Sequence, residues 1–122
     1  MNEALAVIDS LRHEFPGARG APASVALDGV SATIRAGMIT GLIGPDGAGK
    51  TTLLRLMAGL LRASGGRITV FGHDMAKDAD AAHPAIGYMP QRFGLYEDLS
   101  VIENLDLFAD LHALTPTRPR HR

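Results

Sequence analysis

The stretch of sequence that decides the fold is Gly44-Pro45-Asp46-Gly47-Ala48-Gly49-Lys50-Thr51. It fits the pattern G-x-x-x-x-G-K-[ST] at every position. Its glycines permit backbone angles that a Cβ would block, so several amide N–H groups can turn toward one anion. Lys50 brings a mobile positive charge to the β- and γ-phosphates, and the Thr51 hydroxyl can bind a magnesium ion. The pattern therefore predicts a phosphate-binding loop.

The flanking segments match what such a loop requires. Residues 39–43 form a short apolar run that predicts a buried strand before the loop. Residues 52–61 predict a helix after it, with a broad apolar face made by Leu53, Leu56, Met57, Leu60 and Leu61. The alternative is a glycine-rich turn with an incidental lysine. A dinucleotide-binding G-x-G-x-x-G is excluded, because from Gly47 the pattern breaks at Thr52.

Length and composition bound the class of protein. The chain has 122 residues, enough for one domain, with 46% apolar residues, 20% charged residues and a formal net charge of −1. The lack of a basic excess argues against a nucleic-acid partner. With no cysteine, disulfides and thiolate metal sites are excluded. No apolar stretch approaches the roughly 20 residues that span a bilayer, so we expect any membrane role to go through a partner.

The rest of the chain predicts an α/β fold. We expect strands at residues 4–11, 25–34, 67–71 and 85–89, a loop at 15–23, and a loop with a helical turn at 72–84. Ser100 and Glu103 form a capping box that opens a helix from residue 101 to about 113. The expected sheet is partly parallel around residues 39–43, with an antiparallel portion from the first two strands. The proline- and arginine-rich residues 115–122 predict a disordered tail.

Several further segments carry a resemblance to a known family. They are Tyr88-Met89-Pro90-Gln91, the run from Phe93 to Leu105, Ala26-Leu27-Asp28-Gly29-Val30-Ser31, Ala58-Gly59-Leu60-Leu61 and Gly65-Gly66-Arg67-Ile68. Together with the phosphate loop, they resemble the N-terminal half of an ABC transporter ATP-binding subunit of the drug-export type. The resemblance runs from about Leu11 to Leu114. It implies a P-loop NTPase core that binds ATP and Mg²⁺.

The resemblance also implies roles for individual residues. Residues 44–51 would be the Walker A loop, and Thr52 would follow it at the magnesium end. Gln91 would be the Q-loop glutamine, which contacts the metal or the attacking water. Phe15 would stack on adenine, the alternative being a core or loop-anchoring aromatic. For Gln91 the alternative is a solvated loop glutamine.

In the family, the loop around that glutamine abuts the membrane subunit. The resemblance therefore implies that residues 91–96 are a coupling region. For Phe93, Leu95 and Tyr96, ordinary packing is an equally good interpretation.

The chain departs from the family pattern in two ways. Asp46 stands where an asparagine is expected, which places a carboxylate near the triphosphate. The signature motif, the Walker B strand and the switch histidine are also missing. We therefore expect residues 1–114 to be a truncated nucleotide-binding domain with little hydrolysis of its own. The resemblance implies two partners, a membrane-spanning permease subunit and a second ATP-binding domain, at the cytoplasmic face of the membrane.

Two other functions compete with this interpretation. A small P-loop nucleotide kinase would share the loop, but such kinases start almost at the loop and carry an arginine-rich lid. Here 43 residues precede Gly44, and no such lid lies between Lys50 and Leu114. The second alternative is a non-catalytic fragment from a disrupted reading frame.

Overall fold

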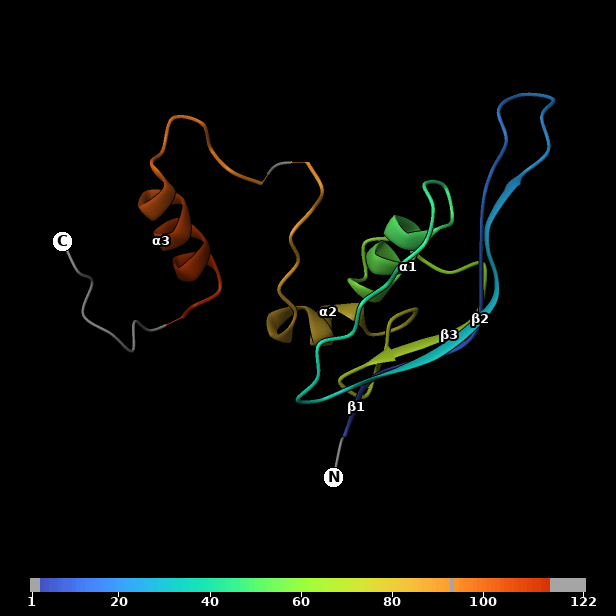
Figure 1. Cartoon of the computed structure of the whole chain (residues 1–122), viewed down its shortest axis with the longest axis horizontal. Helices are drawn as coiled ribbons and strands as arrows, with labels where there is room; N and C mark the ends of the chain where they lie inside the picture. The colour runs from blue at the N-terminus through green and yellow to red at the C-terminus, as the bar shows by residue number, and fades with distance from the viewer. Residues whose placement is uncertain (1–2, 93, 115–122) are drawn as a thin grey trace. The chain divides into compact units, whose positions relative to one another are not determined.

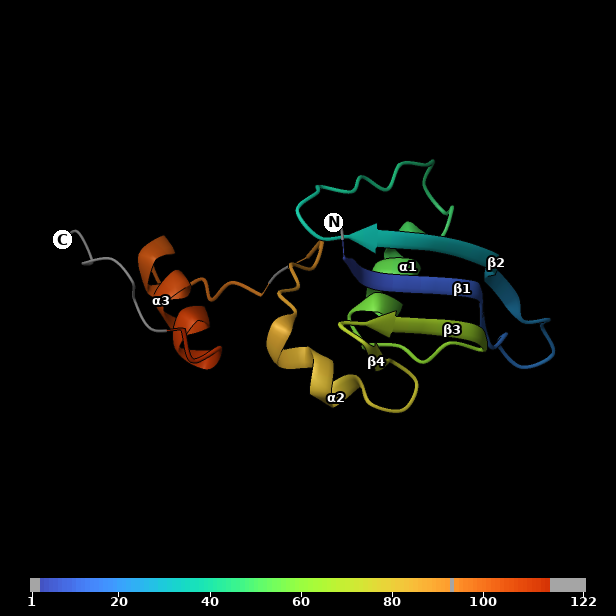
Figure 2. The same ribbon diagram turned by 90° about the horizontal axis from the view of Figure 1, so that it is seen from below.

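The computed structural model describes residues 3–92 and 94–114, and the chain divides into two compact units, Met1–Gly87 and Tyr88–Arg122. The first unit holds a four-stranded sheet in the order β2-β1-β3-β4, in which every pairing is antiparallel. Its strands are β1 Ala4–Phe15, β2 Ser24–Arg35, β3 Gly65–Val70 and β4 His73–Asp74 (Figures 1 and 2). The predicted N-terminal antiparallel portion is therefore confirmed.

β1 is longer than expected and contains a bulge. It runs to Phe15, because Glu14 and Phe15 pair with Val25 and Ser24 of β2, so the predicted loop at 15–23 is shorter. At Ser10 the backbone adopts φ 49°, and the register shifts relative to both neighbouring strands. A bulge of this kind reverses the alternation of side chains along a strand. The buried positions accordingly change from even to odd numbers: Ala6, Ile8, Leu11 and His13.

The core lies between the sheet and α1 Lys50–Met57, which is behind the strands in the view of Figure 2. Leu53 and Leu56 are the buried residues of the helix. They belong to one apolar cluster with strand residues and two later residues: Ala6, Ile8, Leu11, Leu27, Ile68, Val70, Met75 and Ala82. Burial of a leucine side chain contributes about 1.5–3 kcal/mol, so this cluster secures the helix that follows the glycine-rich loop.

α1 begins two residues earlier and ends four residues earlier than the sequence predicted. Its end is set by Gly59, which has φ 73°, and the N–H of Leu60 donates to the carbonyl oxygen of Arg55 at 2.9 Å. A left-handed glycine with such a backbone bond terminates helices. Leu60 and Leu61 therefore lie beyond the helix, although their spacing continued the apolar pattern.

The expected strand at residues 39–43 is absent from the described part of the chain. The segment turns back after β2 and runs along the sheet toward the loop, as both ribbon views show. Ile39 and Ile43 are 102% and 96% exposed. A strand exists only with a hydrogen-bonded neighbour, and no described segment pairs with this one. The predicted parallel part of the sheet is therefore not formed among these residues.

The prediction of a strand at residues 85–89 is also wrong. α2 Ala79–Ala82 is followed by a 3₁₀ turn, His83–Ala85, with Pro84 near its start. Ile86 has extended backbone angles, but it pairs with no strand among the described residues. The helical turn expected within residues 72–84 is confirmed.

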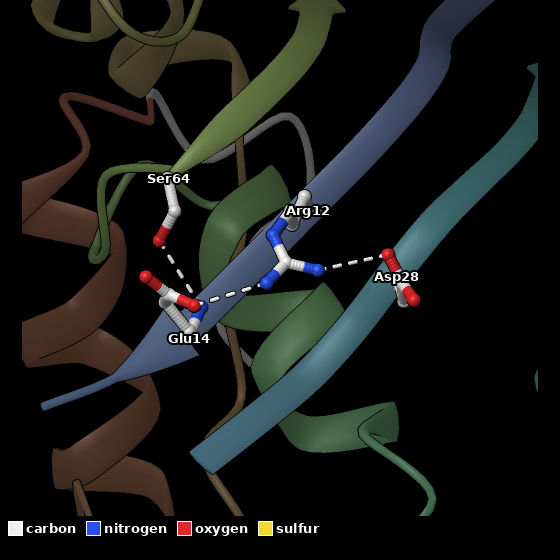
Figure 3. A network of polar contacts seen from close by, with 4 residues as sticks. All are labelled: Arg12, Glu14, Asp28 and Ser64. Atoms are coloured by element: carbon white, nitrogen blue, oxygen red, sulfur yellow. Dashed lines mark hydrogen bonds and ion pairs between the residues drawn. The ribbon is translucent and has the colours of Figure 1, made fainter. Parts of the chain in front are cut away.

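A polar network ties the end of β1 to its surroundings (Figure 3). Arg12 donates from Nη1 to Asp28 Oδ1 of β2 at 2.9 Å and from Nη2 to Glu14 Oε2 at 3.0 Å. The backbone N–H of Glu14 donates to Ser64 Oγ at 3.0 Å, and Ser64 N–H donates to the Arg12 carbonyl oxygen. Asp28, with Glu14 as a smaller contributor, raises the pKa of the Arg12 guanidinium. The network links the end of β1 to β2 and to Ser64, the residue before β3.

The second unit contains α3 Val101–Leu111, and its predicted capping box is confirmed. Ser100 N–H donates to Glu103 Oε2 at 2.7 Å, and Glu103 N–H donates to Ser100 Oγ at 3.3 Å. Asn104 is buried and organises the turn before the helix. It accepts from Tyr96 N–H and donates to the carbonyl oxygens of Tyr96, Leu99 and Ser100. The predicted tail, residues 115–122, lies outside the described residues.

The capping box predicts a pH dependence of α3. Hydrogen bonds from the Ser100 backbone N–H, and secondly from its side chain, lower the pKa of Glu103. Because the folded pKa is below the unfolded value of about 4.3, the box stabilises the helix above that value. This stability is lost as the pH falls through the lowered folded pKa. A carboxyl-carbon NMR titration should give Glu103 a midpoint below that of an unfolded peptide.

The variant Ser100→Ala is the matched control for this titration. It removes the side-chain hydrogen bond and keeps the backbone N–H, so its Glu103 midpoint should move part of the way back. A wild-type midpoint at or above the peptide value would show that the carboxylate is not held by the helix start.

Candidate functional site

The glycine-rich loop is positioned by one close contact with the sheet. Gly49 has φ 96° and ψ 8° and is the residue just before α1. A Cβ built there would lie 2.6 Å from the Ala26 carbonyl oxygen and 2.8 Å from Leu27 Cδ2, both in β2. Only glycine therefore satisfies both the left-handed backbone and the lack of space. The start of α1 is held directly against β2.

Lys50 folds back over the loop that precedes it. Its Nζ donates to the carbonyl oxygens of Gly44 at 2.6 Å and Pro45 at 2.7 Å. An ammonium group has three donors, so two hold the loop and one remains for another acceptor. The loop is also closed by a turn in which Ala48 N–H donates to the Pro45 carbonyl oxygen at 3.2 Å. Hydrogen bonds thus hold the Lys50 ammonium group against the loop backbone.

The N-terminus of α1 has the features of an anion site. The first N–H groups of a helix lack partners within the helix, and its dipole favours negative charge there. No side chain caps this end, and no acidic residue lies in the first turn. Thr51 is exposed and Thr52 is half-buried in that turn. Asp46 is exposed in the loop. This arrangement can hold a phosphate chain on backbone N–H groups, the helix end and Lys50.

Phe15 lies at the end of β1. This strand pairs with β2, and Gly49 lies against the part of β2 nearby. It pairs with Ser24, and His13 pairs with Leu27. The Phe15 side chain is 38% exposed, and its ring centroid lies 4.7 Å from that of His13 at an interplanar angle of 84°. Phe15 is therefore not a fully buried core aromatic, and a loop-anchoring aromatic is still an alternative to adenine stacking.

The sequence patterns assigned no role to His13, which the structure buries. The side chain is 7% exposed, on the same face of β1 as Leu11. The i, i+2 spacing of Leu11, His13 and Phe15 was the available signal.

The other predicted residues belong to the second unit. Gln91 is exposed in a bend, and Phe93 lies outside the described residues. Leu95 and Tyr96 are 60% and 59% exposed and line a mostly apolar hollow of about 430 Å³. Met89, Leu99, Val101, Leu105 and Phe108 also line it.

Two features are absent from residues 3–92 and 94–114. These residues contain no group of three or more His, Cys, Asp or Glu side chains placed to hold a metal ion. They also contain no helix long and apolar enough to cross a bilayer.

The sequence matches the family model of ABC transporter over residues 27–121. It is 54% identical over 115 residues to the probable multidrug ABC transporter ATP-binding protein YbhF of Escherichia coli, covering 94% of this chain and 19% of that protein. It is 45% identical over 97 residues to the daunorubicin resistance ATP-binding protein DrrA3 of Streptomyces coeruleorubidus, covering 80% of this chain and 31% of that protein. The chain therefore spans less than a third of the length of these relatives.

Two solved structures of ABC transporter ATP-binding proteins share the fold of this chain. An ATP-binding subunit of an ABC transporter superposes with a TM-score of 0.73 at 28% identity, covering 92% of this chain and 44% of that one. The dimeric bacterial cassette MJ0796 gives a TM-score of 0.76 at 22% identity, covering 96% of this chain and 50% of that one. The second similarity concerns the fold alone.

Three alanine substitutions test how the loop is held. Gly49→Ala requires a positive φ and places a Cβ against the carbonyl oxygen of Ala26. Gly47→Ala requires a positive φ of 80° but causes no clash. Gly44→Ala causes neither backbone strain nor a clash, since the nearest atom to the added Cβ is Ala48 Cβ at 3.5 Å. We expect the free energy of unfolding to fall by about 1–2 kcal/mol for Gly47→Ala and by more for Gly49→Ala.

Gly44→Ala is the control in this series and should change stability by less than about 1 kcal/mol. Urea denaturation followed by circular dichroism measures all three. Equal losses at positions 44 and 49 would mean that the contact with β2 does not secure the loop.

Proposed function

Because this chain belongs to the ABC transporter family, we propose that it binds ATP and Mg²⁺ through residues 44–52, as part of a transporter's ATP-binding domain. The single observation that carries this proposal is the fold of the loop. Gly49 holds the helix start against β2, and Lys50 lies across the loop carbonyls. Family membership also favours this function over a nucleotide kinase.

The phosphate chain would bind where the loop meets α1. Backbone N–H groups of residues 49–51 and the positive end of the helix would bind the phosphate oxygens. Lys50 would give its third donor to a phosphate oxygen, or exchange its carbonyl partners for phosphate oxygens. Asp46 is exposed, so its carboxylate can point into water and avoid the phosphates.

Separate residues would hold the magnesium ion and the adenine base. Mg²⁺ binds few protein groups and keeps several waters, so the hydroxyl of Thr51 with phosphate oxygens is a sufficient site. Thr52 lies next to it in the same turn. Phe15 offers a partly exposed ring on the strand beside β2, and we assign it to adenine stacking.

We assign the second unit to the coupling region, which contacts the membrane subunit in this family. Gln91 would contact the metal or the attacking water, as the family pattern implies. The apolar hollow with Leu95 and Tyr96 would contact a membrane-spanning permease subunit at the cytoplasmic face of the membrane. A second ATP-binding domain would complete the nucleotide site. Drug export is the corresponding proposal for the substrate class, supported by the names of the relatives.

Nucleotide affinity tests the phosphate site. Lys50→Ala removes a charge-assisted contact worth about 1.5–3 kcal/mol, so it should weaken ATP binding by about 10- to 100-fold. Lys77→Ala is the matched control, because Lys77 is the other lysine of the chain and is exposed in the turn after β4. Isothermal titration calorimetry with Mg-ATP measures both. Equal affinities of the two variants would contradict the proposed site.

Hydrolysis by the isolated chain is a separate prediction. No group in this proposal acts as a general base, and lack of such a base typically costs about 10²- to 10⁴-fold in rate. We expect phosphate release from Mg-ATP at the background level, with no further decrease in Lys50→Ala. Steady release that disappears in Lys50→Ala would show that the chain hydrolyses ATP by itself.

A further inference from the structure

His13 is a buried polar side chain whose placement the phosphate loop does not explain. The imidazole is 7% exposed, and its Nδ1 is fully buried without a hydrogen-bond partner among the described residues. A buried donor or acceptor without a partner destabilises the folded state, and a leucine of similar size would avoid that cost. An apolar residue would therefore suit this position better if the side chain only filled the core.

His13 makes an aromatic contact with Phe15. The two rings meet at 84° with centroids 4.7 Å apart, which is an edge-to-face arrangement. Such a pair is favourable because the positive edge of one ring meets the negative face of the other. In this geometry Phe15 keeps at least one face away from His13, and the ring is 38% exposed. His13 therefore restricts the orientation of a ring that remains open to a ligand.

The ring pair is anchored beside the phosphate loop. His13 pairs in register with Leu27, the residue whose side chain contacts Gly49, and Phe15 pairs with Ser24 on the same strand. Between them, Glu14 is tied to Arg12 and Ser64 by the polar network of Figure 3. The strand that carries the pair is thus paired with β2, whose Ala26 and Leu27 lie against Gly49 at the helix start.

We propose that His13 is a positioning residue for the nucleobase, which holds the Phe15 ring so that its free face stacks on a purine while the phosphates occupy the loop. This inference rests on the proposed function, because it needs Phe15 to contact the base. His13 itself does not touch the ligand. Its contribution is to fix one ring orientation before the nucleotide binds, which lowers the ordering cost of stacking.

The test separates base binding from phosphate binding in the full chain. Affinities for Mg-ATP and Mg-tripolyphosphate are measured by calorimetry for wild type, His13→Leu, His13→Phe and Phe15→Ala. His13→Leu should weaken ATP binding by about 2- to 10-fold, the range of one aromatic pair. It should leave tripolyphosphate affinity unchanged and should not lower the melting temperature. His13→Phe keeps a ring at this position and should restore ATP affinity.

A second measurement covers the case in which the larger His13→Phe side chain prevents folding. In His13→Leu the NMR signals of the Phe15 ring should change and should report faster or wider ring motion. Unchanged Phe15 signals in that variant would overturn the proposal.

The outcomes distinguish this inference from the proposed function. Loss of ATP affinity in Phe15→Ala but not in His13→Leu overturns the role of His13 and leaves the base platform intact. Unchanged ATP affinity in both variants removes the platform, and the inference fails with it. Equal losses of ATP and tripolyphosphate affinity in His13→Leu mean that His13 is only structural, which also overturns the proposal.

Discussion

The close approach of Gly49 to the Ala26 carbonyl oxygen is the contact on which the rest of the first unit depends. It places the N-terminus of α1 at the edge of the sheet and leaves no room for any side chain at that residue. From this point Lys50 reaches back to the loop carbonyls, and Leu53 and Leu56 enter the core. The start of α1, where we propose that phosphate binds, and the apolar cluster are therefore positioned by the same contact.

The bulge at Ser10 has a comparable role for β1. It requires Gly66 opposite, where a Cβ would lie 2.3 Å from the Ser10 carbonyl oxygen. By reversing the alternation, the bulge turns Leu11 and His13 inward, while Arg12 points to the polar network with Asp28. The end of the strand then carries a ring pair on one face and ion pairs on the other. A regular strand with the same sequence would exchange these two faces.

Much of the candidate site was predictable from the sequence because its signals are local. Three glycines, a lysine and a threonine at fixed spacing specify a loop and a helix start, and Ser100 with Glu103 specifies another. Two of the strand predictions, each of which needed a distant pairing partner, failed. Residues 39–43 have the composition of a buried strand, yet Ile39 and Ile43 are exposed because no described segment pairs with them. The end of α1 was missed because Gly59 outweighs the apolar spacing of Leu60.

The sequence by itself predicted a phosphate-binding loop at residues 44–51 and determined the family to which the chain belongs, because both reside in short patterns of residue type and spacing. Only the tertiary structure decided which strands exist, where β1 ends, and that His13 is buried against Phe15. The physical reason is that burial and strand pairing are properties of two segments at once. A bulge that reverses the faces of β1 depends on its neighbours β2 and β3, and one strand's sequence does not encode them.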